Sequence, residues 1–120
     1  MKFEVKIMSG GVNKLGHSYE GDLKKIFEKK CVYGYTGQQS YNQNIILEKI
    51  SHVIEDIKVD DNGNVTGTCR VLDTPNGKIL EGLVESGWEY ETATAGFGIL
   101  KDGVVSDYRL NSIDLVNKKV

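Results

Sequence analysis

The sequence predicts a single α+β domain, a compact curved antiparallel sheet or small barrel that carries two helices. Several segments alternate polar and apolar residues, which is typical of strands with one buried face. Two other segments have the spacing of an amphipathic helix. Fourteen glycines and one proline among 120 residues favour strands and tight turns over a helix bundle. A chain of this length has room for one hydrophobic core, so we expect one domain over residues 1–120.

The N-terminal part of the chain predicts a strand followed by a helix. Residues 2–7 read K-F-E-V-K-I and alternate strictly, which indicates a strand. Residues 22–30 carry their apolar side chains on one helical stripe, and Asp22 is a suitable N-cap. Lys29 and Lys30 suit the negative end of the helix dipole. We therefore expect the helix to run to the end of this segment.

The middle of the chain predicts strands separated by polar turns. Residues 31–35 are short and β-prone, and residues 36–44 form a polar loop without charge. Within the ambiguous segment 45–59, the early part has helical spacing and residues 52–59 read as a strand.

A hairpin turn follows, because the Asn62-Gly63 pair accepts the positive φ that tight hairpins need. The return strand is expected over residues 65–72. Its buried face would carry Val65, Gly67, Cys69 and Val71.

The second helix is predicted over residues 78–86. Residues 73–77 read D-T-P-N-G and serve as its cap, and Gly87 is the expected stop. Its apolar face would consist of Ile79, Leu80, Leu83 and Val84.

From residue 88 onward the chain is predicted to be β again, with a Lys-Asp-Gly turn at 101–103. The last buried strand would be supplied by Tyr108, Leu110, Ile113, Leu115 and Val116.

Composition argues against several classes of partner. The formal net charge is −2 and the arginines are Arg70 and Arg109, so we expect no nucleic-acid partner. No apolar run approaches the roughly twenty residues of a membrane span, so we expect no membrane partner. Cys31 and Cys69 lack paired spacing and are predicted to be reduced, partly buried thiols. We expect neither a metal nor another cofactor.

Five collinear segments resemble the prohead (capsid-maturation) proteases of tailed phages. Two are close: residues 71–79 read V-L-D-T-P-N-G-K-I, nearly the family consensus, and residues 50–56 read I-S-H-V-I-E-D against R-V-S-H-V-I-x-D. Residues 112–116 read S-I-D-L-V where the family has G-I-D-x-V. The remaining matches are residues 11–19 and 65–67. The resemblance implies a herpesvirus-protease-like fold and serine-protease chemistry.

The departures from the family fall at its catalytic places. Its G-E-L-x-H-P motif carries the histidine base, and Gln38 stands there in this chain. Its V-S-S-R-G-x-G motif carries the serine nucleophile, and here Ala93 and Thr94 replace the two serines while Ala95 replaces the arginine. A glutamine amide accepts no proton near neutral pH, and an alanine has no attacking oxygen. These losses predict a pseudo-protease that is not an enzyme.

Three hypotheses about function follow. The first is a non-catalytic phage virion or procapsid protein, assembled in the host cytoplasm, which binds the major capsid protein or other head proteins as an auxiliary or decoration protein. The second is an active maturation protease that cleaves scaffold and capsid precursors with a non-standard site, Thr94 with His52 as base. The third is an unrelated small β-rich adaptor whose likeness is fold-deep.

Candidate binding residues lie in two places, the polar loop of residues 36–44, which is rich in amide side chains, and the aromatic pair Trp88 and Tyr90. The loop is either a contact surface for another protein or a plain connection. The aromatic pair is either an interface anchor or part of the core. The residues are Gln38, Gln39, Tyr41, Trp88 and Tyr90. His52, the weak catalytic candidate, has the alternative of a structural histidine with its hydrogen bonds satisfied.

Overall fold

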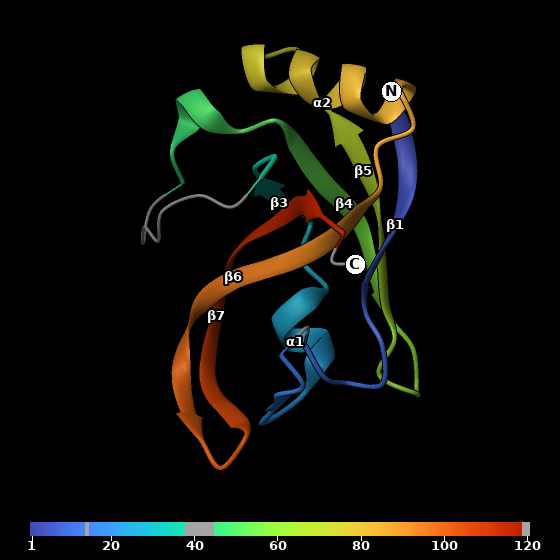
Figure 1. Ribbon diagram of the computed structural model, residues 1–120. Helices are drawn as coiled ribbons and strands as arrows, with labels where there is room; N and C mark the ends of the chain where they lie inside the picture. The colour runs from blue at the N-terminus through green and yellow to red at the C-terminus, as the bar shows by residue number, and fades with distance from the viewer. Residues whose placement is uncertain (14, 38–44, 119–120) are drawn as a thin grey trace.

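The computed structural model in Figure 1 describes residues 1–13, 15–37 and 45–118. Its elements confirm the predicted α+β class, with mainly antiparallel sheets and two α-helices. In chain order they are β1 (Lys2–Met8), β2 (Ser18–Tyr19), α1 (Leu23–Phe27), β3 (Cys31–Gly34), a 3-10 turn (Leu47–Lys49), β4 (His52–Val59), β5 (Val65–Val71), α2 (Pro75–Glu85), β6 (Tyr90–Lys101) and β7 (Val104–Asn117).

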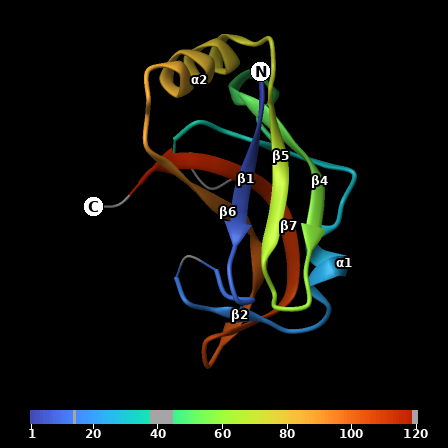
Figure 2. The same cartoon turned by 90° about the vertical axis from the view of Figure 1, so that its right-hand side faces the viewer.

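The strands form two sheets that wrap around one core. The first has the order β1-β5-β4-β3 and is antiparallel throughout, and the second has the order β2-β7-β6. The sheets join just after β3, where Leu115 of β7 donates to the Tyr35 carbonyl and accepts from the Gly37 amide. On the other side β1 and β6 are both edge strands (Figure 2). The result is a small barrel that is joined between β3 and β7 and open between β1 and β6.

The core lies inside this barrel, between the inner faces of the two sheets. The helices lie at its two ends, α2 beside the N-terminus and α1 near the β6–β7 ribbon (Figure 1). Each helix contributes one fully buried side chain to the core: Phe27 from α1 and Leu80 from α2. The strands contribute Val5, Ile7, Val32, Ile54, Ile57, Val65, Cys69, Ile113 and Leu115, among others.

The β4–β5 hairpin forms as predicted and is held by its own turn residues. The Asp60 carboxylate accepts the backbone N–H groups of Asn62 and Asn64, each at 2.9 Å. Gly63 has a φ of 77°, and a Cβ there would lie 2.6 Å from the Gly11 nitrogen. A side chain at that position would therefore face both backbone strain and a clash.

Helix α1 is shorter than predicted. Asp22 caps it as expected, accepting the Lys24 amide at 2.9 Å. The helix ends at Phe27 because Glu28 leaves helical geometry, and its carboxylate accepts the Val59 amide at 3.1 Å. That bond ties the chain to β4, so the predicted continuation to residue 30 was wrong.

Helix α2 begins earlier than predicted, at Pro75. Thr74 caps it by accepting the Gly77 amide at 2.9 Å, and proline suits the first helical turn, where no N–H partner is needed. Gly87, with a φ of 88°, follows its end as expected. The predicted apolar face was wrong at Ile79, which is 57% exposed because Leu80 takes the core position.

Two further differences concern short features. Strand β2 was not predicted, because two residues pairing in parallel with Val104 and Val105 leave no periodic pattern in the sequence. Cys31 is exposed rather than partly buried, because its side chain lies on the outer face of the edge strand β3, whereas Cys69 is fully buried.

Within the described ranges, no helix has the length and apolar character needed to cross a membrane.

Candidate active site

The β6–β7 ribbon separates its side chains onto two faces. In the antiparallel register Ala93 lies opposite Asp114, and Ala95 lies opposite Ser112. Directly opposed residues point to the same side of a ribbon, so these four share one face. The inward-facing neighbour Ile113 belongs to the core, so this is the outer face of the barrel. We call Ala93, Ala95, Ser112 and Asp114 the outer polar face.

Asp114 is a buried carboxyl on this face, 7% exposed. Its Oδ1 accepts the backbone N–H of Tyr35 at 3.0 Å. Burial raises the pKa of Asp114 to about 6, although the bonds from Tyr35 and Ser112 act in the opposite direction. A carboxyl that titrates near neutral pH can either hold or release a proton under working conditions.

Ser112 is more deeply buried, at 1% exposed. Its hydroxyl makes no hydrogen bond of ordinary geometry to any residue the structure describes, yet it helps to lower the pKa of Asp114. The two side chains therefore interact electrostatically without a formed hydrogen bond. A buried hydroxyl without a formed bond is uncommon and calls for an explanation.

His52 is fully buried beside the same strand, on the opposite edge of β7 from β6. Its Nε2 lies 2.8 Å from the Ile113 carbonyl oxygen, which can only accept, so Nε2 carries the proton. Nδ1 then accepts from the Ser51 hydroxyl at 2.7 Å, and Ser51 in turn accepts from the Thr36 hydroxyl at 2.8 Å. Burial lowers the pKa of His52 to about 4. The neutral imidazole thus joins the two sheets.

The sequence makes room for this contact with a glycine. Gly34 of β3 lies opposite His52 of β4. A Cβ at Gly34 would lie 1.9 Å from the Ile113 oxygen and 2.4 Å from the His52 Nε2. Only glycine lets the imidazole reach the neighbouring sheet.

The structure does not bring Thr94 and His52 together. Thr94 lies on β6 opposite Ile113, so its side chain points to the inner face rather than the outer one. The Ile113 carbonyl that binds His52 points away from β6. Strand β7 therefore separates the two side chains, and both ring nitrogens of His52 already have partners.

The other predicted site residues divide into two groups. Gln38, Gln39 and Tyr41 lie outside the described residues. Trp88 donates from Nε1 to the Asn117 side chain at 2.7 Å, and its ring lies 5.6 Å from that of Tyr90.

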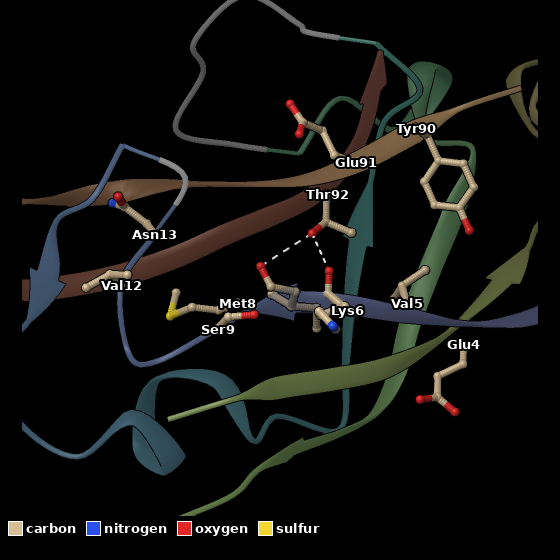
Figure 3. Close-up of a pocket in the computed structure, with 11 residues that line it drawn as sticks. Glu4, Val5, Lys6, Met8, Ser9, Val12, Asn13, Tyr90, Glu91 and Thr92 are labelled. Carbon is tan, nitrogen blue, oxygen red and sulfur yellow. Dashed lines mark hydrogen bonds between the residues drawn. The ribbon is translucent and has the colours of Figure 1, made fainter. Parts of the chain in front are cut away.

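A groove of about 600 Å³ runs between β1 and the start of β6 (Figure 3). Thr92 spans it at one point, donating to the carbonyl oxygens of Lys6 at 2.7 Å and Ile7 at 3.3 Å. Tyr90 lines it from β6, and Val12 and Asn13 line it from the loop after β1. In the part of the chain that the structure describes, no group of three potential metal ligands is found here or elsewhere.

Comparison with solved structures finds a match over nearly the whole chain. The capsid assembly protease of bacteriophage T4 superposes with a TM-score of 0.77 and 22% sequence identity, covering 96% of this chain and 80% of that one. The chain has the fold of a phage capsid assembly protease. No protein-family model matches the sequence, and no curated protein matches it either.

This likeness contradicts the prediction that the chain is not an enzyme. That prediction depended on the side chains at positions 38, 93 and 94, whereas the matching fold is that of a protease. It also overlooked polar groups elsewhere on the outer polar face. Ser112 and Asp114 were not singled out because they alternate with Ile113 and Leu115 in what reads as an ordinary strand. The signal that could have found them is a hydroxyl and a carboxyl two residues apart in a strand that is buried on both faces.

Proposed function

We propose that this domain is a protease of phage head assembly, which cleaves scaffold and capsid precursors, and that Ser112 and Asp114 carry its chemistry. The observation that carries the proposal is the structural likeness to a capsid assembly protease over 96% of the chain. The partners would be the major capsid protein and other head proteins, and the place of action would be the procapsid.

The proposed nucleophile has moved across the β6–β7 ladder. The related family carries a serine where this chain has Ala93, and a glycine where this chain has Ser112. Ala93 and Ser112 lie diagonally opposite on the outer polar face. Diagonal neighbours have Cα atoms roughly 7 to 8 Å apart. The hydroxyl lost from one strand is therefore restored on the next, close to its former place.

Asp114 is the proposed proton acceptor. As the Ser112 oxygen attacks a peptide carbonyl carbon, its proton passes to the Asp114 carboxylate. The proton then moves to the departing amine as the C–N bond breaks and an ester forms on Ser112. A water molecule then gives a proton to Asp114 as it attacks the ester carbon. The bond from Ser112 to the acyl group breaks, Asp114 returns the proton to the Ser112 oxygen, and the free acid is released. The raised pKa of Asp114, about 6, suits a group that takes up and returns a proton near neutral pH.

Burial of the pair sets a condition on this chemistry. Ser112 and Asp114 are almost inaccessible, and the Tyr35 amide is bonded to Asp114. Substrate reaches them only when the segment at Tyr35 and Thr36 moves away from β7. We therefore expect slow turnover by the isolated domain and faster turnover in assembled procapsids.

The test is cleavage of the scaffold and major capsid precursors of the parent phage, followed by gel and mass spectrometry. Wild type should produce defined fragments. Ser112→Ala should lower the rate by about 10³-fold or more, as loss of a nucleophile does in serine proteases. Thr94→Ala, on the inner face, should cleave at close to the wild-type rate. Intact precursors with wild type in assembled procapsids would contradict the proposal.

A further inference from the structure

The three residues after β3 lie along the edge of β7 that faces away from β6. Leu115 of β7 donates its amide to the Tyr35 carbonyl at 3.0 Å and accepts the Gly37 amide at 2.8 Å. Thr36, between these two residues, forms a parallel bridge with Leu115. We call Tyr35, Thr36 and Gly37 the strap. The strap thus pairs with β7 as a short extra strand.

The strap also covers the outer polar face. The Tyr35 amide donates to the Asp114 carboxylate at 3.0 Å. Asp114 is 7% exposed and Ser112 is 1% exposed, although the residues opposite them on β6 are alanines. A methyl group is too short to cover a side chain on the neighbouring strand. The cover therefore comes from the other edge of β7, where the strap lies.

Two side-chain hydrogen bonds fasten the strap to other parts of the chain. The Thr36 hydroxyl donates to the Ser51 hydroxyl at 2.8 Å, and the Tyr35 hydroxyl accepts the Ile46 amide at 2.7 Å. Ser51 is itself bonded to His52, so the first of these bonds connects the strap to the imidazole that joins the two sheets. Either bond can be removed by a substitution outside the outer polar face.

The strap can leave β7 without disrupting either sheet. The β3–β4 ladder ends at the pair of Gly34 and His52, so the strap lies beyond it. The β6–β7 ladder does not use the backbone groups of Leu115, because these point to the strap. Local openings that break few hydrogen bonds occur more often than unfolding of the core. The bonds of the strap can therefore open together while the barrel stays folded.

We propose that the strap is an autoinhibitory contact, which closes the site of Ser112 and Asp114 in the free domain and opens it by detaching from β7 as a unit. This inference rests on the proposed function, because it describes the control of the same site. It adds that the resting domain is closed by its own chain, and that the bond from Thr36 to Ser51 helps to set the fraction of open molecules.

The first test measures opening of the strap without any cleavage. Ser112→Cys in a Cys31→Ser background places a thiol under the strap, and Cys69 in the same molecule reports on opening of the core. We expect the thiol reagent DTNB to label position 112 at least about 100-fold faster than Cys69 in the native protein. Thr36→Val removes one hydrogen bond from the closed state, and should raise the labelling rate at position 112 about fivefold.

A second measurement keeps Ser112 in place, in case the added thiol disturbs the fold. Hydrogen exchange followed by NMR should show that the amides of Leu115 and Gly37 exchange at similar rates, both faster than amides at the centre of the β4–β5 ladder. Thr36→Val should speed the exchange of both about fivefold.

The third measurement is precursor cleavage by the isolated domain. Thr36→Val should raise its rate about fivefold, since more molecules are open. Thr68→Val on β5 is the matched control, because its side chain lies on the opposite side of that strand from the buried Cys69. It should leave labelling, exchange and cleavage within about twofold of the parent.

Each measurement has a result that would count against the strap. Labelling at position 112 no faster than at Cys69, or labelling and exchange that Thr36→Val leaves unchanged, would overturn the strap as a moving cover. Unchanged cleavage by Thr36→Val, in a domain that does cleave the precursors, would overturn its autoinhibitory role. Fast labelling and exchange without any precursor cleavage would instead contradict the proposed function and leave the opening of the strap supported.

Discussion

His52 donates its Nε2 proton to the carbonyl oxygen of Ile113, 2.8 Å away, and so links the two sheets through one buried neutral imidazole. The ring is fully buried, and its other nitrogen accepts from Ser51. Removing the imidazole would leave the Ile113 carbonyl and the Ser51 hydroxyl without these bonds. Buried polar groups that lose a partner cost about 1 to 3 kcal/mol each.

The first prediction is that acid destabilises the fold through His52. Its pKa is about 4 when folded and 6.5 when unfolded. The unfolded state therefore binds more protons between these values, so the stabilisation is complete above pH 6.5 and is lost as pH falls toward 4. Urea unfolding across this range should show the loss, and a His52→Gln variant should lack this slope at a lower overall stability. An unchanged slope in the variant would contradict the assignment.

The second prediction is that Asp114 opposes this trend. Burial raises its pKa from 3.8 to about 6, so the folded state binds more protons in this window and stability falls as pH rises through it. Asp114→Asn removes that contribution. Its stability should therefore rise more steeply with pH than that of wild type between pH 4 and 6. Parallel curves from the same urea titrations would show that Asp114 has an ordinary pKa.

The third prediction concerns Gly34. Gly34→Ala places a methyl group 1.9 Å from the Ile113 oxygen, so strand β3 must move and the His52 contact must break. We expect a loss of about 3 kcal/mol or more in the free energy of unfolding. Gly82→Ala is the matched control, because its Cβ meets no atom within 4 Å on helix α2. That variant should gain about 0.5 to 1 kcal/mol.

The fourth prediction separates the two cysteines. Cys31 is exposed, whereas burial raises the pKa of Cys69 to about 12. A thiol reagent such as DTNB should label one cysteine in the native protein and both after denaturation, since thiolate is the reactive form. Cys31→Ser should abolish native labelling. Rapid native labelling of that variant would mean that the core around Cys69 opens readily.

Helices and strands were predicted correctly where their boundaries depend on residues close together in the sequence. Strand β4 begins at His52 as predicted, and the caps at Asp22 and Gly87 act as their residue types suggest. Helix α1 was overextended because Glu28 bonds to Val59, a residue far along the chain. Such tertiary contacts override local propensity and leave no periodic signal.

The candidate site was harder to predict than the fold. Motif comparison directed attention to positions 93 and 94, because chemistry was expected at the same places along the chain. Strand pairing instead places Ser112 and Asp114 on the same face as Ala93. A register is a property of two strands together, so neither segment alone reveals which residues share a face.

The most direct test of the central proposal is covalent labelling of assembled procapsids with a fluorophosphonate, followed by peptide mapping. We predict an adduct on Ser112 that is lost in Ser112→Ala and strongly reduced in Asp114→Asn, since the reagent requires an activated hydroxyl. Absence of any adduct on Ser112 under conditions in which the precursors are being cleaved, or an adduct on Thr94 in its place, would contradict the account.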